Sequence, residues 1–177
     1  MNLVRKSNLA TQNRLVKRTL LTVAATATVL ALGAAGPAAA DLARAKNFGA
    51  FAPAGPDGWR KSGPYPEYKE KGLSKGSTSL TSYSNRNGAG SINLEFKDHI
   101  SKGDRTAVEN PKLFGDKSTM IKGLKAGFKP CGEKVKIAAY RIITGKYLVK
   151  LTCTEVPNDV ALKMLKSIDY KAVAAVK

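Results

Sequence analysis

Apolar and polar residues alternate most regularly over Ser91–Lys97, where Ile92, Leu94 and Phe96 fall on one side of an extended chain. This period of two predicts a strand with one buried face. The run 79–84 before it is rich in Ser, Thr and Tyr, and the letters NRNGAG between the two runs supply the Asn and Gly that are typical of tight turns. The two runs therefore predict an antiparallel hairpin.

A second hairpin is predicted from two stronger strands at 134–142 and 146–155, which a Thr-Gly turn joins. The later strand alternates, and one of its faces carries Tyr147, Val149, Leu151 and Cys153. Because these residues share a face, we expect Cys153 to point toward the core.

The period changes from two to that of a helix after Pro157. The apolar positions of this segment are Val160, Ala161, Met164, Leu165 and Ile168. Such a stripe is typical of an amphipathic helix, and the closing letters YKAVAAVK predict a further helical turn or two. One face of an antiparallel sheet has to be covered, and this helix has the stripe to do so. We therefore predict an α+β fold in which an antiparallel β-sheet built from hairpins is covered by a C-terminal amphipathic helix.

Two regions have weaker patterns. The segment 41–78 changes from a short helical hint to turn formers and charges, and it predicts a loop-rich N-terminal part of the domain. Within it, residues 63–77 are interpreted as a loop or as irregular edge structure, and a long loop in a compact domain is often functional or mobile. The segment 99–123 is interrupted by Pro and Gly and supports no assignment.

The first 40 residues have the pattern of a secretory signal peptide. Five basic residues and no acidic one occupy 1–18, an apolar run follows over 19–35, and small residues precede Asp41. A membrane anchor and an organelle transit peptide are rival interpretations, but a spanning helix usually needs about 20 strongly apolar residues. We expect cleavage before Asp41, a periplasmic or secreted protein, and no transmembrane segment in the mature chain.

Removal of residues 1–40 leaves 137 residues, the size of a single domain, so 41–177 is predicted to be one mature α+β domain. Five of the 30 basic residues leave with the leader while all 13 acidic residues stay, which gives the mature chain a net charge of about +12. That exceeds the magnitude of about 2 to 8 suggested for a small soluble domain. The basic excess therefore belongs to the domain itself.

The only two cysteines are Cys131 and Cys153. In an exported protein, an even number of cysteines usually indicates a disulfide bond. Closing a loop of roughly 20 residues stabilises a fold by about 3 kcal/mol in the chain-entropy model. A redox role would need closer spacing of the two thiols, so the predicted disulfide is structural.

No motif for catalysis or for metal binding stands out. The single histidine, His99, lies between Asp98 and Ser101, but a catalytic triad is assembled in space and not by neighbours in sequence. One His, two Cys and three Met leave no cluster with the spacing of a zinc or copper site. We expect no catalytic residue, no metal and no cofactor.

Positive charge is the remaining signal. Lysine greatly outnumbers arginine, which favours diffuse attraction to a negative surface over bidentate binding. Nucleic acid is excluded as a partner because export separates the protein from it and no aromatic-basic motif occurs. The expected partner is an anionic envelope surface, such as lipid headgroups or lipopolysaccharide, or an acidic protein. The candidate contacts are Trp59, Arg60, Lys61, Lys69, Lys71, Lys75, Lys122, Lys125 and Lys129, and Lys112 and Lys117 add to the same excess.

The order of motifs resembles a family. A Gly58-Trp59 pair follows the leader, then a tyrosine-containing strand that turns through Asn-Gly, an alternating strand, and the runs GLKAGFK, GKYLVKL and SIDYKAVAAV. Over Gly58 to Val176 this order resembles small exported proteobacterial proteins whose α/β sandwich is similar to that of the photosystem II extrinsic protein PsbP. The resemblance implies a binding or assembly module. The cysteine pair and the basicity depart from the family pattern, so no ligand and no catalytic residue are carried over.

The first hypothesis is thus a non-enzymatic binding module of the periplasm or the exterior. A second is an enzyme or enzyme accessory that uses the 59–75 loop, with Tyr65 and Tyr68 beside Lys61 and Lys69 as contacts. A third is a structural role in a larger envelope assembly, and a lysine-covered soluble protein without a specific partner stays open beside them.

Overall fold

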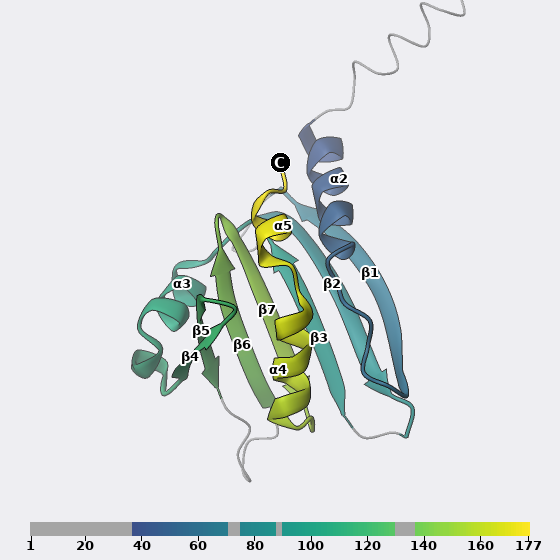
Figure 1. Ribbon diagram of the computed structural model, residues 1–177. Coiled ribbons are helices and arrows are strands. Elements are labelled where there is room, and N and C mark those ends of the chain that lie inside the picture. The colour runs from purple at the N-terminus through teal and green to yellow at the C-terminus, as the bar shows by residue number, and fades with distance from the viewer. Residues whose placement is uncertain (1–36, 71–74, 88–89, 130–136) are drawn as a thin grey trace, which may run out of the picture. The chain divides into compact units, whose positions relative to one another are not determined.

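A computed structural model describes residues 37–70, 75–87, 90–129 and 137–177. Within them, seven strands form one sheet in the order β1-β2-β3-β7-β6-β5-β4, and every neighbouring pair is antiparallel (Figure 1). The strands are β1 (Trp59–Lys69), β2 (Gly76–Asn85), β3 (Ser91–Lys97), β4 (Lys117–Ile121), β5 (Leu124–Lys129), β6 (Ile137–Thr144) and β7 (Tyr147–Thr154). With the helices described below, this confirms the α+β class with an antiparallel sheet.

Both predicted hairpins are confirmed. In the first, Tyr83 of β2 lies opposite Ile92 of β3, and in the second the turn between β6 and β7 places Thr144 opposite Tyr147. The two hairpins meet in the middle of the sheet, where β3 pairs with β7 along seven residue pairs. Strands far apart in sequence are thereby joined into one surface.

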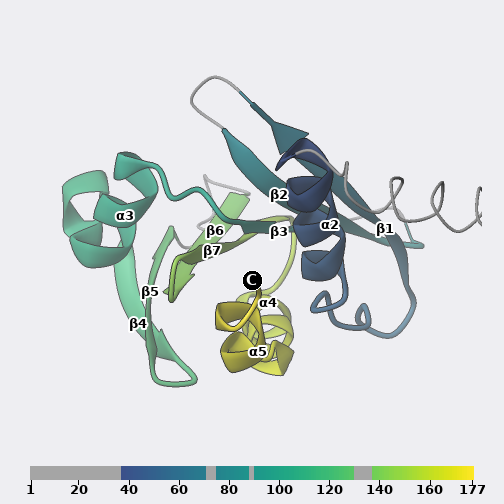
Figure 2. The same ribbon diagram turned by 90° about the horizontal axis from the view of Figure 1, so that it is seen from above.

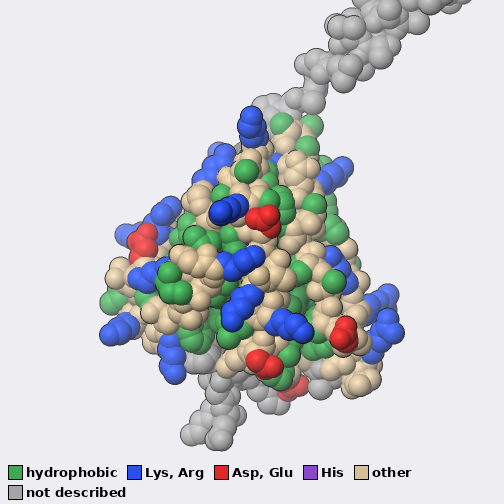
Figure 3. Space-filling model, viewed as in Figure 1, with side chains coloured by type: hydrophobic (Ala, Val, Ile, Leu, Met, Phe, Trp, Pro, Cys, Tyr) green, Lys and Arg blue, Asp and Glu red, His purple; other side chains and the backbone are tan. Residues whose placement is uncertain are grey.

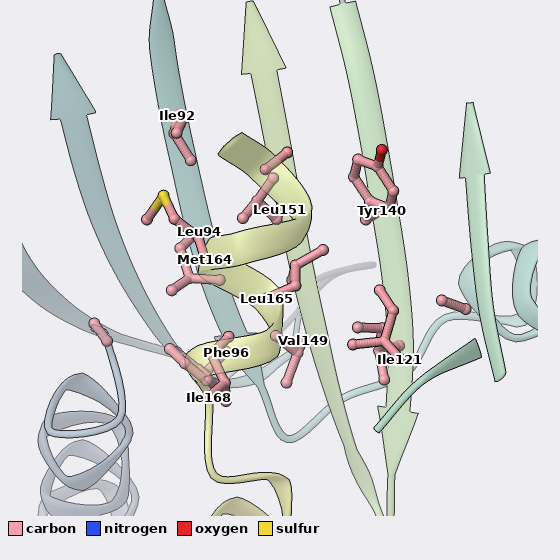
Figure 4. Packing of buried hydrophobic residues seen from close by; sticks show 14 of the residues in the cluster. Ile92, Leu94, Phe96, Ile121, Tyr140, Val149, Leu151, Met164, Leu165 and Ile168 are labelled. Carbon is pink, nitrogen blue, oxygen red and sulfur yellow. The ribbon is translucent and has the colours of Figure 1, made fainter. Parts of the chain in front are cut away.

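The buried apolar side chains gather on one face of the sheet, where α2 (Pro37–Gly49), α4 (Asn158–Ser167) and α5 (Tyr170–Ala174) also lie (Figure 2). Figure 4 shows α4 in front of β3 and β7, with apolar side chains between the helix and the strands. Side chains in this cluster include Leu94, Phe96, Val149, Leu151, Met164 and Leu165. Each such side chain, once buried, contributes about 1.5–3 kcal/mol relative to an exposed position.

The helix α2 is held to the same face by an aromatic contact and by polar groups. The ring of Phe48 packs edge-on against Tyr147, with 5.1 Å between the ring centroids. At the other end of the helix, the Ser77 hydroxyl donates a hydrogen bond of 2.8 Å to the carbonyl oxygen of Asp41. These contacts come from residues that follow the predicted cleavage position.

The predicted loop-rich character of 41–78 is wrong over most of the segment, since α2 runs to Gly49 and β1 occupies Trp59–Lys69. Pro64 and Pro66 lie inside β1, which is possible because β1 is the edge strand of the sheet and its outward positions need no N–H donor. The register shifts between Ser62 and Tyr65. The other interpretation, irregular edge structure, is confirmed over residues 63–69, which belong to β1.

The sequence patterns did not indicate the elements between β3 and β6. They are α3 (Lys102–Glu109), the 3-10 helix η1 (Pro111–Phe114) and the β4–β5 hairpin. The turn of this hairpin is formed by Lys122 and Gly123, with φ of 49° and 80°, the pair of positive values that a type I′ turn requires. The helix α3 packs on the face of β5 away from the core, so closely that a Cβ at Gly127 would overlap the carbonyl oxygen of Ala107.

Cys153 is completely buried on β7 and belongs to the hydrophobic core, as its alternation predicts. Cys131 lies outside the described residues, so the Cys131–Cys153 disulfide stays a prediction. Residues 1–36 are outside them as well, and the signal peptide likewise stays a prediction. The compact unit into which the described part falls spans Ala38–Lys177.

Candidate docking surface

The helix η1 and the strands β4 and β5 lie at one end of the molecule's sheet, and the surface of this region carries charge of one sign. Between Asn110 and Lys129, every exposed charged side chain is a lysine. The one acidic residue of this stretch, Asp116, is 7% exposed and pairs with Arg141. We call the segment 110–129 the basic corner.

Large apolar side chains are exposed in the same segment. Leu113 and Phe114 of η1 are 75% and 55% exposed, and Met120 of β4 is 62% exposed. They are three of the five large apolar residues exposed in the described part of the chain. Figure 3 shows Lys and Arg side chains interspersed with hydrophobic ones on the side of the molecule where α3 and β4 lie. Clustered exposed apolar groups rimmed by polar ones are typical of interaction sites.

A groove of about 690 Å³ runs between η1 and the hairpin. Its walls include Asn110, Lys112 and Leu113 on the η1 side and Lys117, Ser118 and Lys125 on the hairpin side. The ammonium groups of Lys112 and Lys117 form no hydrogen bond or ion pair with any described residue. These two charges are therefore available to a partner.

Ion pairs beneath the surface of the basic corner fix its shape. The guanidinium of Arg141 on β6 lies 3.2 Å from a carboxylate oxygen of Asp104 and 3.5 Å from one of Asp116. Asp104 also accepts a hydrogen bond of 2.6 Å from the hydroxyl of Ser101, which caps the start of α3. Asp104 and Asp116 are thus engaged inside the fold, whereas Glu109, which also lines the groove, is exposed and lies 3.7 Å from Arg105.

The turn that ends η1 depends on a glycine. Gly115 has a φ of 69° and its N–H donates to the carbonyl oxygens of Lys112 and Pro111. A residue with a Cβ would be strained in this left-handed conformation. The tight turn holds Leu113 and Phe114 outward.

Three of the predicted contact lysines donate hydrogen bonds within the fold. The ammonium of Lys61 donates to the carbonyl oxygens of Ala52 and Pro53, at 2.8 and 3.1 Å. Lys122 donates to the carbonyl oxygen of Ile168 at 3.0 Å, and Lys125 donates to that of Glu109 at 2.7 Å. Each of the three joins segments that are separate in the sequence.

The other candidates are not gathered at one place. Trp59 packs against the core at the start of β1, and Lys69 forms an exposed ion pair with Glu67 at 3.2 Å. Arg60, Lys75 and Lys129 are exposed, and only Lys129 belongs to the basic corner. Lys71 lies outside the described residues.

The loop needed by the enzyme alternative is absent over Trp59–Lys69, because this stretch is strand β1. Lys61 and Lys69 are engaged as described, while Tyr65 is exposed and Tyr68 is half-buried on the strand. Among the described residues, no group of three or more His, Cys, Asp or Glu side chains could hold a metal ion. None of the described helices has the length and apolar composition needed to cross a bilayer.

The sequence patterns did not mark Leu113, Phe114 and Met120 as candidate contacts, and they placed Lys112 and Lys117 only in the general charge. One signal in the sequence could have indicated this site. After Asp116 the lysines follow one another without an acid, and a Leu-Phe pair between Pro and Gly precedes them. The chain matches no protein-family model, no curated protein and no solved structure.

Proposed function

We propose that this protein is an exported, non-enzymatic binding or assembly module that docks through its basic corner on an anionic envelope component or an acidic protein. The observation that carries the proposal is the coincidence of exposed lysines, exposed apolar side chains and a groove in one segment of about 20 residues. A generally basic surface would not need the apolar groups.

The chemistry of the corner suits this role. Ammonium groups attract anions without demanding one geometry, and that attraction is screened by salt. Leu113 and Phe114 add apolar contact once the partner is close, and salt does not screen this part. A partner should therefore bind with an electrostatic component that salt removes and a remainder that it does not.

The proposal includes the finer features expected from the sequence. In it, α4 is the cover of the core face of the sheet, and a Cys131–Cys153 disulfide ties β7 to the segment before β6. The leader is removed before Asp41, and the domain is related to the PsbP-like sandwich that its motifs resemble. The buried Met164 and Leu165 of α4 support the first of these.

The test compares two variants that lose the same charge. Lys112→Gln with Lys117→Gln removes the available charges of the corner, and Lys163→Gln with Lys166→Gln removes two exposed charges on α4. The probes are vesicles containing phosphatidylglycerol and, as a model of an acidic protein, poly-glutamate. At about 1 kcal/mol per lysine near an anionic surface, the corner variant should bind its probe roughly 30-fold more weakly.

The α4 variant should bind almost as well as the parent protein. Equal weakening of both variants would show that net charge alone governs binding, and the corner would then have no special role. Absence of binding to either probe at low salt would contradict the proposal altogether.

A further inference from the structure

The outer edge of β4 is the feature from which we draw the further inference. We propose that this edge accepts an extended acidic segment of a partner protein as an additional antiparallel strand. The inference rests on the proposed function and names the partner as a peptide chain. It predicts main-chain pairing in addition to attraction between charges.

The turn of the β4–β5 hairpin decides which backbone groups face outward. In a hairpin closed by a two-residue turn, the flanking residues exchange backbone hydrogen bonds, and bonded pairs then alternate with pairs that are not bonded. Ile121 and Leu124 flank the turn and form a hydrogen-bonded pair, so Met120 and Ser118 belong to pairs that are not hydrogen-bonded. Their N–H and C=O groups therefore point away from β5.

Those groups have no strand beyond them. The sheet described here ends at β4, and Lys117, Ser118 and Met120 are all exposed. A row of unpaired N–H and C=O groups is a template on which another chain can pair. The edge is short, so its flanking side chains must supply much of the selectivity.

The opposite edge of the same sheet provides a contrast. In β1, Pro64 and Pro66 remove backbone donors, the register shifts between Ser62 and Tyr65, and charged side chains alternate with them. These are the devices by which proteins protect an edge against pairing. The strand β4, with the sequence KSTMI, has neither proline nor a register shift.

The side chains beside the edge indicate the composition of the incoming strand. Because side chains alternate along a strand, Ser118 and Met120 lie on one face of β4 and Lys117 lies on the other, and both Lys117 and Ser118 line the groove. A strand with apolar residues on the side of Met120 and acidic residues on the side of Lys117 would complement both. An alternating pattern of apolar and acidic residues meets this requirement.

A bilayer fits this edge less well than a peptide. Exposed backbone N–H and C=O groups are costly to place against lipid, because lipid tails offer no hydrogen bonds. An added strand satisfies the same groups directly. The edge thus favours a peptide, and the vesicle probe measures the other possibility.

The experiment uses the protein labelled with ¹⁵N and an eight-residue peptide of alternating Val and Glu, capped at both ends. Binding is measured by fluorescence polarisation, and amide hydrogen exchange by NMR. Addition of the peptide should slow exchange at the amides of Ser118 and Met120 at least tenfold, and leave exchange in β1 unchanged.

Two further peptides separate strand pairing from charge. One carries N-methyl groups on the Val amides and the other on the Glu amides, so both keep the same charge. Because alternate amides of an added strand face β4, one of these peptides should lose at least tenfold in affinity and the other should keep it. Equal affinity of the two would overturn strand pairing.

A protein variant gives an independent check. Ser118→Pro removes one outward donor without removing a hydrogen bond to β5, and it should weaken peptide binding at least tenfold while vesicle binding is kept. Unchanged peptide binding by this variant would also overturn the inference. Vesicle binding without peptide binding would refute the added strand and leave the proposed function intact, whereas failure of all probes would refute both.

Discussion

At the scale of single residues, burial raises the pKa of the Tyr83 hydroxyl to about 12. This hydroxyl donates a hydrogen bond of 2.8 Å to the carbonyl oxygen of Pro53. The pKa of this hydroxyl is about 10 in the unfolded chain and higher in the folded one. The protonated hydroxyl therefore stabilises the fold fully below pH 10, and this stability is lost as the pH rises to about 12. Tyr83→Phe should therefore lower the free energy of unfolding by about 1 kcal/mol at pH 7.

The same comparison at high pH tests the ionisation. Urea unfolding of the parent protein and of Tyr83→Phe at several pH values from 7 to 11.5 should show a difference that shrinks above pH 10. Titration of the lysines affects both proteins alike and cancels in the difference. A difference that stays constant over this range would contradict a raised pKa at Tyr83.

Lys61 and its neighbour Arg60 should contribute differently to the stability of the fold. Its ammonium holds the carbonyl oxygens of Ala52 and Pro53, while Arg60 is exposed and has no partner among the described residues. Lys61→Met should lower the free energy of unfolding by about 1 kcal/mol, since these charged hydrogen bonds are only partly buried. Arg60→Met should change it by less than about 0.5 kcal/mol. Equal effects in urea unfolding would show that the carbonyl contacts do not contribute.

At the scale of elements, the position of α3 depends on the absence of a side chain at Gly127 of β5. A Cβ there would overlap the carbonyl oxygen of Ala107, so Gly127→Ala should push α3 away from the sheet and lower the free energy of unfolding by about 1–3 kcal/mol. Gly103→Ala is the matched control inside α3, where the nearest atom to the new Cβ lies at 3.9 Å.

The control should be neutral, or stabilising by up to about 1 kcal/mol, because Ala favours a helix over Gly. Thermal unfolding monitored by circular dichroism would compare the two variants. If both raised stability, the close approach of α3 to β5 would not constrain the fold.

The elements differ in how far their sequences reveal them. The strands β3 and β7 bury apolar side chains on one face, so a period of two marks them, whereas the buried face of β2 carries Ser77, Ser79 and Thr81 and shows no such apolar alternation. The edge strand β4 buries only Ile121 completely, and without a buried face no alternation arises. In β1, Pro64 and Pro66 indicate a loop when only the local sequence is considered. A strand is possible there because β1 lies at the edge of the sheet.

At the scale of the whole molecule, the sequence predicts the basicity but not which lysines are available. Lys122 donates to the carbonyl oxygen of Ile168, 46 positions later in the chain, and no local pattern indicates such a contact. Nor does the sequence reveal that Asp116 is buried beneath the corner, which leaves lysines as its only exposed charges. The basic character of the candidate site could thus be predicted from the sequence, but its position on the fold could not.

The two ends of the described domain meet at Arg44 of α2. Its guanidinium lies 2.8 Å from Asp41 and 3.0 Å from Asp98 at the end of β3, and its Nε donates to the carbonyl oxygen of Lys177. The hydrogen bond with Asp98 raises the pKa of Arg44, so the charged form is favoured in the fold. Through this side chain α2, the sheet and the C-terminal residue are held as one unit.

Arg44→Met should therefore destabilise the whole domain. It leaves the partly buried carboxylate of Asp98 without its cation, at a cost of about 1–2 kcal/mol after allowance for solvent screening. Lys46→Met removes the same charge from the exposed side of the same helix and should change the free energy of unfolding by less than about 0.5 kcal/mol. Hydrogen exchange should quicken in α2 and at Ser77 in the Arg44 variant only. Similar stability of the two variants would show that α2 is held by its apolar contacts alone, with Phe48 as the main anchor.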